Sequence, residues 1–379
     1  MNKINIRVLG SYGESNFGDD ALLHTIHKYF MTDFSEHNVI YESQDGKIKF
    51  RENNNALEIV GVSANAEHPS VTIYGGGTQF YSFKDRNIYT KPLFLLKLLC
   101  SPRSLLKYVG YKLNFNPHKS NHKTLALGIG LGPFVDKKVK DNVFNNLAKM
   151  EYASVRDSYS YDQSIRRGLS NVDHHTDICY SMESDMFILN KEIGSIKHIG
   201  IIVRDWNLEK NGRKYYEQIL SFAELKKGEG YLVTYIVFSS KQDIEWIDKL
   251  EKSNEELLVW NSEKNNLNDF MVKLSTFDVF ITARYHGAIF ASLLRKPFIT
   301  IEIDPKLKLL SEVYNTSSKN WSYPFSLEEL NTYFSEIEND YYSFVMDSDI
   351  ETKKQVKIVK DMESSFTKEL HKVLKDIRD

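Results

Sequence analysis

The chain has 379 residues, which is more than one compact core usually holds, so we expect two domains. Hydrophobic residues make up 41% and charged residues 26%, which is typical of a folded globular protein and excludes a disordered chain. The formal net charge of -2 predicts no nucleic-acid partner. Two cysteines are too few for a disulfide framework, no cysteine and histidine spacing indicates a metal site, and a reducing compartment fits.

Short apolar runs rich in β-branched residues alternate with amphipathic stretches along the chain. The predicted strands are residues 4–10, 71–77, 124–132, 198–204, 231–238, 278–284 and 297–303. Strands that alternate with helices form parallel sheets covered on both faces, so the predicted class is α/β. We expect two similar doubly wound sheets facing one cleft at the carboxyl ends of their strands.

A polar stretch at residues 181–197 interrupts this pattern, and we predict domains at 1–190 and 191–340 followed by a helical tail at 341–379. Beyond about Asn315 we expect no further strand. Apolar residues then recur at steps of three and four, as on one face of a helix that packs back on the body. They are Val356, Val359, Met362, Phe366, Leu370, Val373 and Ile377.

The amino-terminal apolar run is too short for a signal peptide, and nowhere do 18 apolar residues run together, so we expect a soluble, cytoplasmic protein. Residues 91–123 combine lysines with apolar runs, and no acidic residue occurs between Asp85 and Asp136. This composition is typical of a segment that contacts a membrane surface from the inner face. An ordinary core-facing helix with a basic solvated side fits it equally well.

The stretch "DVFITARYHGAIFASLLRKPFITIEIDPK" places a cation and an imidazole directly after a buried strand. We expect the turn at Ala283 to Gly287 and the helix from Ala288. Helix amino ends favour anions, arginine offers a planar fork for phosphate or carboxylate, and histidine carries a proton near neutral pH. Arg284 and His286 therefore suit an anionic substrate that needs acid catalysis. The alternative is that Arg284 pairs with a structural carboxylate and His286 caps the helix.

Glycine-rich turns follow three strands of the predicted first sheet. In "GSYGESNFGDDALL" (10–23), Asn16 or Asp19 can cap the next helix, and the glycine spacing is not the dinucleotide fingerprint. Gly76 and Gly77 in "YGGGTQF" and the glycines of "GIGLGP" (128–133) end the other two strands. Their repetition favours the floor of a cleft, although each alone fits a tight turn.

Two further arginines end strands. Arg156 in "ASVRDSYS" could face the same cleft or form a structural pair with an aspartate. Arg204, which ends "GIIVR", is a weaker candidate for the same anion and could equally hold the domains together.

Taken in order, "YGESNFGDDAL", "YGGGTQF", "LGIGLGP", "SVRDSYS" and "ITARYHGAIFASLLRKPFITIEIDPK" resemble the polysaccharide pyruvyl transferase family. The resemblance covers roughly Ile4 to Lys306. It implies two Rossmann-like domains in a GT-B-like arrangement, with the acceptor on the amino-terminal side and the donor on the other. It also implies phosphoenolpyruvate as donor, a cell-surface glycan or lipid-linked oligosaccharide as acceptor, and a pyruvate ketal as product. This chemistry requires no metal, and we expect no cofactor besides the co-substrate phosphoenolpyruvate.

The resemblance carries roles to the matching residues. It gives Arg284, Tyr285 and His286 roles in donor binding and catalysis and gives Arg156 a role in donor binding. In the mechanism that this chemistry requires, His286 is the expected acid, Arg284 and Arg156 hold phosphoenolpyruvate, and the base is Asp19, Asp20 or Glu14, which the sequence does not rank. The expected substrate-binding residues are Arg156, Arg204, Tyr285, Gly287, Asn16, Gly76, Gly77 and Lys306. Two rival functions share this fold, namely a GT-B glycosyltransferase with a nucleotide-sugar donor and a non-catalytic glycan-binding protein.

Overall fold

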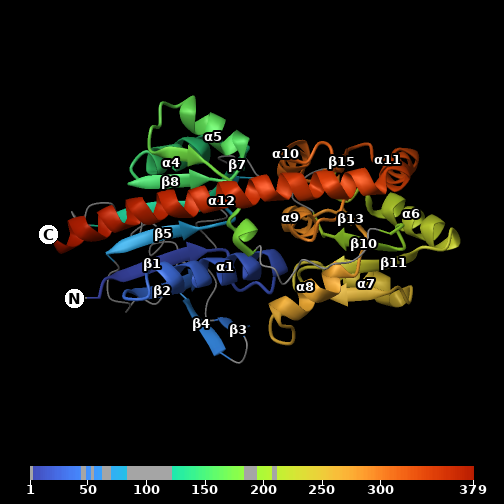
Figure 1. Ribbon diagram of the computed structural model, residues 1–379, viewed down its shortest axis with the longest axis horizontal. Helices are drawn as coiled ribbons and strands as arrows, with labels where there is room; N and C mark the ends of the chain where they lie inside the picture. Colours follow the sequence, from blue (N-terminus) through green and yellow to red (C-terminus); the bar gives the residue numbers. More distant parts are fainter. Residues whose placement is uncertain are drawn as a thin grey trace, which may run out of the picture.

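Two sheets with helices on their faces lie one beyond the other along the long axis of the molecule (Figure 1). The computed structural model describes residues 3–43, 48–52, 55–61, 70–82, 122–182, 194–206 and 211–379. The prediction of an α/β chain with two doubly wound sheets and a terminal helix is confirmed.

The first sheet has nine strands within the described residues, in the order β3-β4-β2-β1-β5-β7-β8-β9, and β6 pairs with β7. Its strands are β1 (Asn5–Gly10), β2 (Asn38–Ser43), β3 (Ile48–Glu52), β4 (Asn55–Gly61), β5 (Val71–Gly75), β6 (Thr78–Ser82), β7 (Lys123–Phe134), β8 (Tyr152–Val155) and β9 (Val172–His174). These pairings are parallel except that of β3 with β4. The central strands were predictable because strands buried on both faces are continuously apolar.

The second sheet has six parallel strands in the described part of the chain, in the order β12-β11-β10-β13-β14-β15. They are β10 (His198–Val203), β11 (Leu232–Val237), β12 (Leu257–Val259), β13 (Val279–Thr282), β14 (Phe298–Ile301) and β15 (Ser318–Trp321). The expectation that strands stop near Asn315 is wrong, because β15 pairs with β14. Its sequence, SKNW, lacks an apolar run because it is a short strand at the sheet edge with two half-buried residues.

The helices cover the sheets and connect their strands. They are α1 (Phe17–Asp33), α4 (Lys137–Leu147), α5 (Ser158–Ile165), η2, a 3-10 helix (Ile178–Met182), α6 (Tyr216–Gly228), α7 (Ile244–Lys252), α8 (Leu267–Ser275), α9 (Tyr285–Leu293), α10 (Pro305–Val313), α11 (Leu327–Asn339) and α12 (Tyr341–Arg378). The helix after β13 begins at Tyr285 rather than Ala288, with Arg284 at the N-cap position. The turn between β13 and α9 is therefore shorter than the predicted turn.

Helix α12 runs along the length of the molecule and crosses both sheets (Figure 1). It contacts α9 and α11 on the side of the second sheet and η2, β7 and β8 on the side of the first. The predicted apolar face is buried from Val356 to Val373, and Ile377 packs partly buried against the same core. This helix therefore ties the two halves of the chain together.

An aromatic side chain of the first half, that of Phe17, inserts into the second. The ring of Phe17, the first residue of α1, lies 5.0 Å from Phe238, 4.9 Å from Trp260, 4.6 Å from Phe270 and 4.8 Å from Phe290, measured between ring centroids. All five side chains are buried in one core cluster. Since such a cluster excludes water, the amino end of α1 is fixed relative to the second sheet.

Backbone contacts reinforce this junction. The N-H of Phe17 donates to the carbonyl oxygen of Phe238 at 2.8 Å, and Asn16 forms an isolated β-bridge with Ser239. Asn16 also caps α1, because its side chain accepts from the N-H of Gly18 at 3.2 Å. The predicted capping role of Asn16 is thereby confirmed.

Removing the Phe17 ring is expected to destabilise the junction by about 3 to 5 kcal/mol, as for other buried phenylalanines. We expect Phe17→Ala to unfold in two separate urea transitions, because the halves lose their shared aromatic contact. Phe144→Ala, which removes a ring from a core cluster confined to the first sheet, is the matched control and should lower the midpoint without splitting the transition. A single transition for Phe17→Ala with an unchanged midpoint would contradict this prediction.

The basic segment predicted at residues 91–123 lies almost entirely outside the described residues, as does most of the polar stretch at 181–197. In the described ranges, no helix combines the length and the hydropathy that crossing a bilayer requires.

Candidate active site

One cavity of about 190 Å³ lies where the carboxyl ends of the two sets of strands meet. A buried water needs only about 10 to 15 Å³ on this measure, so the cavity has room for a small metabolite. It is lined by nine of the residues predicted for the site: Asn16, Asp19, Gly77, Arg156, Arg204, Arg284, Tyr285, His286 and Lys306. They come from both sheets, so neither half alone forms the cavity.

Two predicted glycines lie away from this lining. A Cβ atom at Gly287 would meet the side chain of Thr282 and lie 2.8 Å from Ile202 Cδ1, so this glycine packs α9 against the second sheet. A Cβ atom at Gly76 would lie 2.8 Å from Leu22 Cδ2. Both residues therefore allow close packing behind the cavity wall rather than close approach of a ligand.

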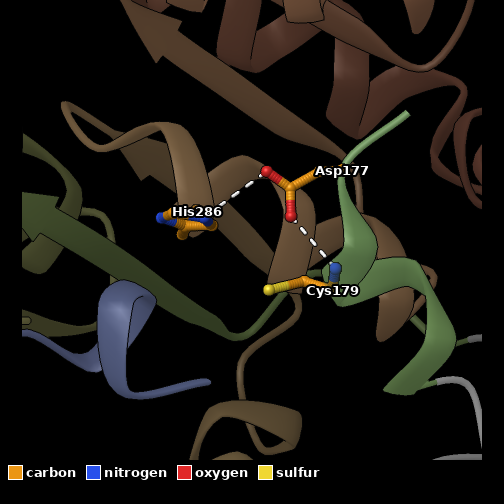
Figure 2. Close-up of side chains that lie close together, drawn as sticks. All are labelled: Asp177, Cys179 and His286. Carbon is orange, nitrogen blue, oxygen red and sulfur yellow. Dashed lines mark hydrogen bonds and ion pairs between the residues drawn. The ribbon is translucent and has the colours of Figure 1, made fainter. Parts of the chain in front are cut away.

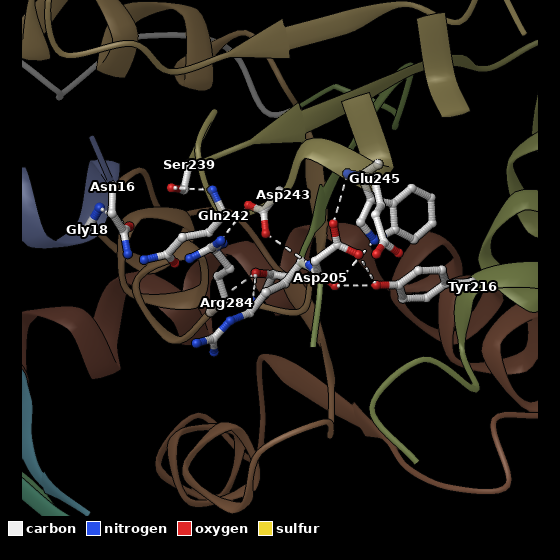
Figure 3. Close-up of polar contacts among 12 residues, drawn as sticks. Asn16, Gly18, Asp205, Tyr216, Ser239, Gln242, Asp243, Glu245 and Arg284 are labelled. Atoms are coloured by element: carbon white, nitrogen blue, oxygen red, sulfur yellow. Dashed lines mark hydrogen bonds and ion pairs between the residues drawn. The ribbon is translucent and has the colours of Figure 1, made fainter. Parts of the chain in front are cut away.

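Three of the cations in the cavity wall are each backed by a buried aspartate. Arg284 pairs with Asp243, as Figure 3 shows, and both side chains are buried. Arg156 Nη1 lies 2.6 Å from Asp177 Oδ2. Lys306 Nζ lies 2.9 Å from Asp304 Oδ2. Because each carboxylate lies behind its cation, the cations present their positive charge to the cavity.

The partner of Arg284 is itself held in a polar network around the start of α7. Asp243 Oδ1 accepts from the N-H of Asp205 at 2.9 Å, and Asp205 accepts from the hydroxyl of Tyr216 at 2.6 Å (Figure 3). The second carboxylate oxygen of Asp205 accepts from the N-H of Glu245 at 3.1 Å. These bonds fix Asp243 and, through it, the guanidinium of Arg284.

Arg156 is fixed from three sides. Besides the ion pair with Asp177, its Nη2 donates to Thr78 Oγ1 at 2.8 Å, and its guanidinium lies 4.3 Å from the centroid of the Tyr285 ring. Tyr285 belongs to α9 of the second half, whereas Arg156 follows β8 of the first. The alternative of a structural Arg-Asp pair is thus correct in part, but the partner is Asp177 rather than the adjacent Asp157, and Arg156 also lines the cavity.

Arg204 differs from the other cations because no ion pair joins it to an acidic side chain among the described residues. Its guanidinium stacks on the Trp206 ring at 3.9 Å from the ring centroid. Burial and the nearby charge of Arg284 lower the pKa of Arg204 to about 10. The group still carries its charge at neutral pH, and a bound anion would offset its repulsion with Arg284.

His286 lies between elements of the first half of the chain. Its Nε2 is 3.6 Å from Asp177 Oδ2, and the other carboxylate oxygen of Asp177 accepts from the N-H of Cys179 at 3.0 Å (Figure 2). The histidine is the second residue of α9, so the alternative that it merely caps the helix is wrong.

Asp177, Cys179 and His286 together have the spacing of metal ligands, although the sequence spacing did not predict such a group. The surrounding charges favour a different arrangement. Burial and the charge of Asp177 raise the pKa of the Cys179 thiol well above its usual value, and Asp177 is already paired with Arg156. A divalent cation would have to displace the thiol proton beside a guanidinium, so the cluster suits a histidine that faces a buried carboxylate better than a metal.

The three candidate bases, Asp19, Asp20 and Glu14, differ in whether their side chains can reach the cavity. Asp19 lines the cavity, and burial raises its pKa despite the opposing effect of His286 and the neighbouring cations. Asp20 points away, since its carboxylate accepts from Trp260 Nε1 at 2.7 Å. Glu14 is not among the lining residues. Asp19 is therefore the carboxylate with access to a ligand.

The Asp20 contact predicts a pH-dependent stability. Burial raises its pKa from 3.8 to about 7, although the Trp260 bond opposes this. The folded state therefore holds the proton more tightly than the unfolded state, and this contribution to stability is full below about pH 4 and lost as the pH rises to about 7. Asn at this position still accepts the indole N-H without a charge. We expect Asp20→Asn to raise Tm relative to wild type more at about pH 8 than at about pH 5.

Scanning fluorimetry at both pH values measures this difference, and Asp33→Asn, an exposed change on the same helix, is the control. An equal Tm difference at both pH values for Asp20→Asn would show that the carboxylate does not titrate in this range.

A profile of the polysaccharide pyruvyl transferase family matches residues 16–305, which is more than half of the chain and includes the cavity residues from Asn16 to Arg284 and His286. The chain belongs to this family. The resemblance seen in the sequence motifs is thus confirmed. Among proteins of curated function, none matches the sequence.

Solved structures share the fold at low sequence identity. The α,α-trehalose 6-phosphate synthase from Burkholderia multivorans has a TM-score of 0.54 at 10% identity and covers 100% of this chain and 99% of its own. A putative UDP-N-acetylglucosamine 2-epimerase from Listeria monocytogenes has a TM-score of 0.54 at 10% identity, with 92% and 91% covered. The UDP-GlcNAc 2-epimerase from Methanocaldococcus jannaschii has a TM-score of 0.51 at 11% identity, with 89% and 93% covered. These neighbours support the GT-B-like arrangement of the two sheets.

The aspartates behind the cations were not predicted from the sequence. Asp177 follows β9, Asp243 follows β11, and Asp304 follows β14, so a signal existed in the form of an aspartate shortly after each strand. Their partners could not be read from the sequence, because Asp177 and Asp243 pair with residues 21 and 41 positions away.

Proposed function

We propose that the protein transfers a pyruvyl group from phosphoenolpyruvate to two hydroxyls of one sugar, forming a pyruvate ketal on a cell-surface glycan or its lipid-linked precursor. The observation that carries this proposal is the gathering of Arg156, Arg204, Arg284 and Lys306 around His286 in one cavity. Phosphoenolpyruvate bears a carboxylate and a phosphate, and four cations beside a proton carrier match both anionic groups and the acid step.

The donor lies against the cations in this scheme. Arg284 and Arg156 bind its anionic groups, and both guanidinium groups are buried and already oriented by their aspartates, so little side-chain freedom is lost on binding. Arg204, which has stacking but no ion pair among the described residues, adds a charge that a bound anion neutralises.

The first step is proton transfer. His286 in its imidazolium form gives a proton to the methylene carbon, the electrons of the carbon-carbon double bond form the new C-H bond, and positive charge develops at the neighbouring carbon. A sugar hydroxyl attacks that carbon and forms a C-O bond, and Asp19 accepts the hydroxyl proton. Asp19 is suited to this role by its position in the cavity and its raised pKa.

The second step releases phosphate. The bond between the carbon and the phosphate oxygen breaks, its electron pair leaves with the phosphate, and Arg284 stabilises the departing charge. The second sugar hydroxyl then attacks the same carbon and gives its proton to the neutral His286, which restores the acid and closes the ketal, while the proton held by Asp19 leaves with the phosphate. One phosphoenolpyruvate and one diol give one ketal and one phosphate, so the scheme needs no metal ion and no redox cofactor.

Two measurements test the proposal. Saturation-transfer NMR should detect binding of phosphoenolpyruvate and not of UDP-sugars, which separates this activity from a nucleotide-sugar glycosyltransferase. A panel of lipid-linked and nitrophenyl glycosides should then contain an acceptor that triggers phosphate release and gains the mass of one pyruvate minus one water. UDP-sugar binding without phosphoenolpyruvate binding, or sugar binding without any turnover, would contradict the proposal.

A further inference from the structure

We infer that Asp177 and Gly18, both from the first half of the chain, seat the imidazole of His286 from the second half, and that Asp177 is the positioning residue for proton transfer. The inference rests on the proposed function and deepens it, because it assigns a role to two residues that do not line the cavity. It also assigns the proton exchange to Nδ1 of His286.

Asp177 connects three groups at once. Its side chain is fully buried, its Oδ2 lies 2.6 Å from Arg156 Nη1 and 3.6 Å from His286 Nε2, and its Oδ1 accepts from the N-H of Cys179 at 3.0 Å (Figure 2). Although burial favours the neutral acid, the charges of Arg156 and His286 and the Cys179 N-H hold the pKa of Asp177 below its usual range. Asp177 is therefore an anion whenever the enzyme works, and it faces the Nε2 edge of the ring.

Gly18 holds the opposite edge of the ring. A Cβ atom at this position would lie 2.6 Å from Cγ of His286 and closer still to Nδ1, so the imidazole packs directly on the first turn of α1. The φ angle of Gly18 is outside the left-handed region, so glycine is required here by the space that the ring occupies and not by the backbone. Asn16 and Asp19 line the cavity on this side.

The two contacts select one nitrogen for catalysis. Nε2 is buried without a hydrogen-bond partner and faces Asp177 Oδ2 at 3.6 Å, so the charge of the carboxylate, rather than a hydrogen bond, favours a proton on this nitrogen. Nδ1 is on the side of α1, where the cavity lies, and is the nitrogen that can exchange a proton with a ligand. A carboxylate that orients a histidine in this way acts without touching the substrate.

The arrangement also couples the two halves of the site. Asp177 orients Arg156, which binds the donor in the proposed scheme, and the same carboxylate orients His286, which protonates it. The buried carboxylate of Asp177 therefore sets the distance between the guanidinium of Arg156 and the imidazole of His286. A displacement of one half of the chain relative to the other would disturb the positions of both groups.

The first test is a double-mutant cycle in the full-length protein. Asp177→Asn keeps the size of the side chain and can still accept from Arg156 and Cys179, so it removes mainly the charge. We expect it to lower kcat of acceptor-dependent phosphate release by about 10²-fold in the wild-type background, and by less than about 3-fold in a His286→Ala background, where no ring remains to be oriented. Asp349→Asn, which removes the charge of an aspartate paired with Arg295, is the control and should leave kcat unchanged in both backgrounds.

Equal loss from Asp177→Asn in both backgrounds would overturn the inference, because a purely structural carboxylate acts regardless of the histidine. Unchanged kcat in the wild-type background would also overturn it. A wild-type enzyme without turnover on any acceptor would overturn the proposed function itself.

The second test needs no activity. Gly18→Ala is expected to lower Tm by about 2 to 5 °C in the wild-type background, because the new methyl group collides with the imidazole. In the His286→Ala background the same change should leave Tm unchanged or raise it, since alanine is favourable in a helix. An equal decrease of Tm in both backgrounds would show that the ring does not pack on Gly18, whatever reaction the enzyme performs.

Discussion

Replacing His286 by alanine is expected to lower kcat for acceptor-dependent phosphate release from phosphoenolpyruvate by about 10²- to 10⁴-fold, the usual contribution of a general acid. The KM for phosphoenolpyruvate should change much less, because the cations that bind the donor remain. Stopped-time phosphate assays with and without acceptor measure both constants. The expected pattern is a loss in the chemical step with donor binding retained.

The control for this prediction is His371→Ala, which removes an exposed histidine from α12 and should leave both constants unchanged. Turnover of His286→Ala within a few-fold of wild type would remove the histidine from the mechanism. It would leave the family membership untouched, since that rests on the match over residues 16–305.

Replacing Arg284 by alanine is expected to have two effects with separate causes. Donor binding and turnover should be lost with the guanidinium. The free energy of unfolding should fall by about 3 to 5 kcal/mol, because Asp243 is fully buried and would be left without its charged partner. Urea unfolding and phosphoenolpyruvate titration measure the two effects independently.

A second change separates the causes. In the double variant Arg284→Ala, Asp243→Asn no unpaired charge remains, so much of the stability should return while turnover stays low. Arg295→Ala, which breaks the partly exposed pair with Asp349, is the control and should change neither turnover nor stability by a comparable amount. Recovery of turnover in the double variant would contradict a direct role of Arg284 in the site.

The central strands, and the residues at their carboxyl ends, could be predicted from the sequence. Strands such as β7 and β13 are buried on both faces, so their apolar runs stand out, and in a parallel sheet the residues that follow them meet at one edge. This is why Arg156 and Arg284, which are 128 positions apart in the numbering, could both be expected in one cleft.

Other features depend on contacts that local sequence does not encode. The edge strand β15 is polar and short, so it has no strand-like pattern of its own and forms by pairing with β14. The ion pairs of Arg284 with Asp243 and of Arg156 with Asp177 join separate turns, and only the folded arrangement selects these aspartates over nearer ones such as Asp157. The seating of His286 on Gly18 likewise required the two halves to be brought together.

The insertion of Phe17 into the second half bears on how substrates arrive. A hinge motion that separates the two sheets would remove the Phe17 ring from its aromatic pocket. This costs about 3 kcal/mol or more, so such open conformations make up less than about 1% of molecules. Under the proposed function, phosphoenolpyruvate and sugar are then expected to enter and leave through a fixed opening beside the half-exposed ring of Tyr81 and the exposed Ser11. If the acceptor is a glycan as proposed, the dimensions of this opening, rather than the amplitude of a hinge motion, are expected to limit the size of the glycan that reaches the site.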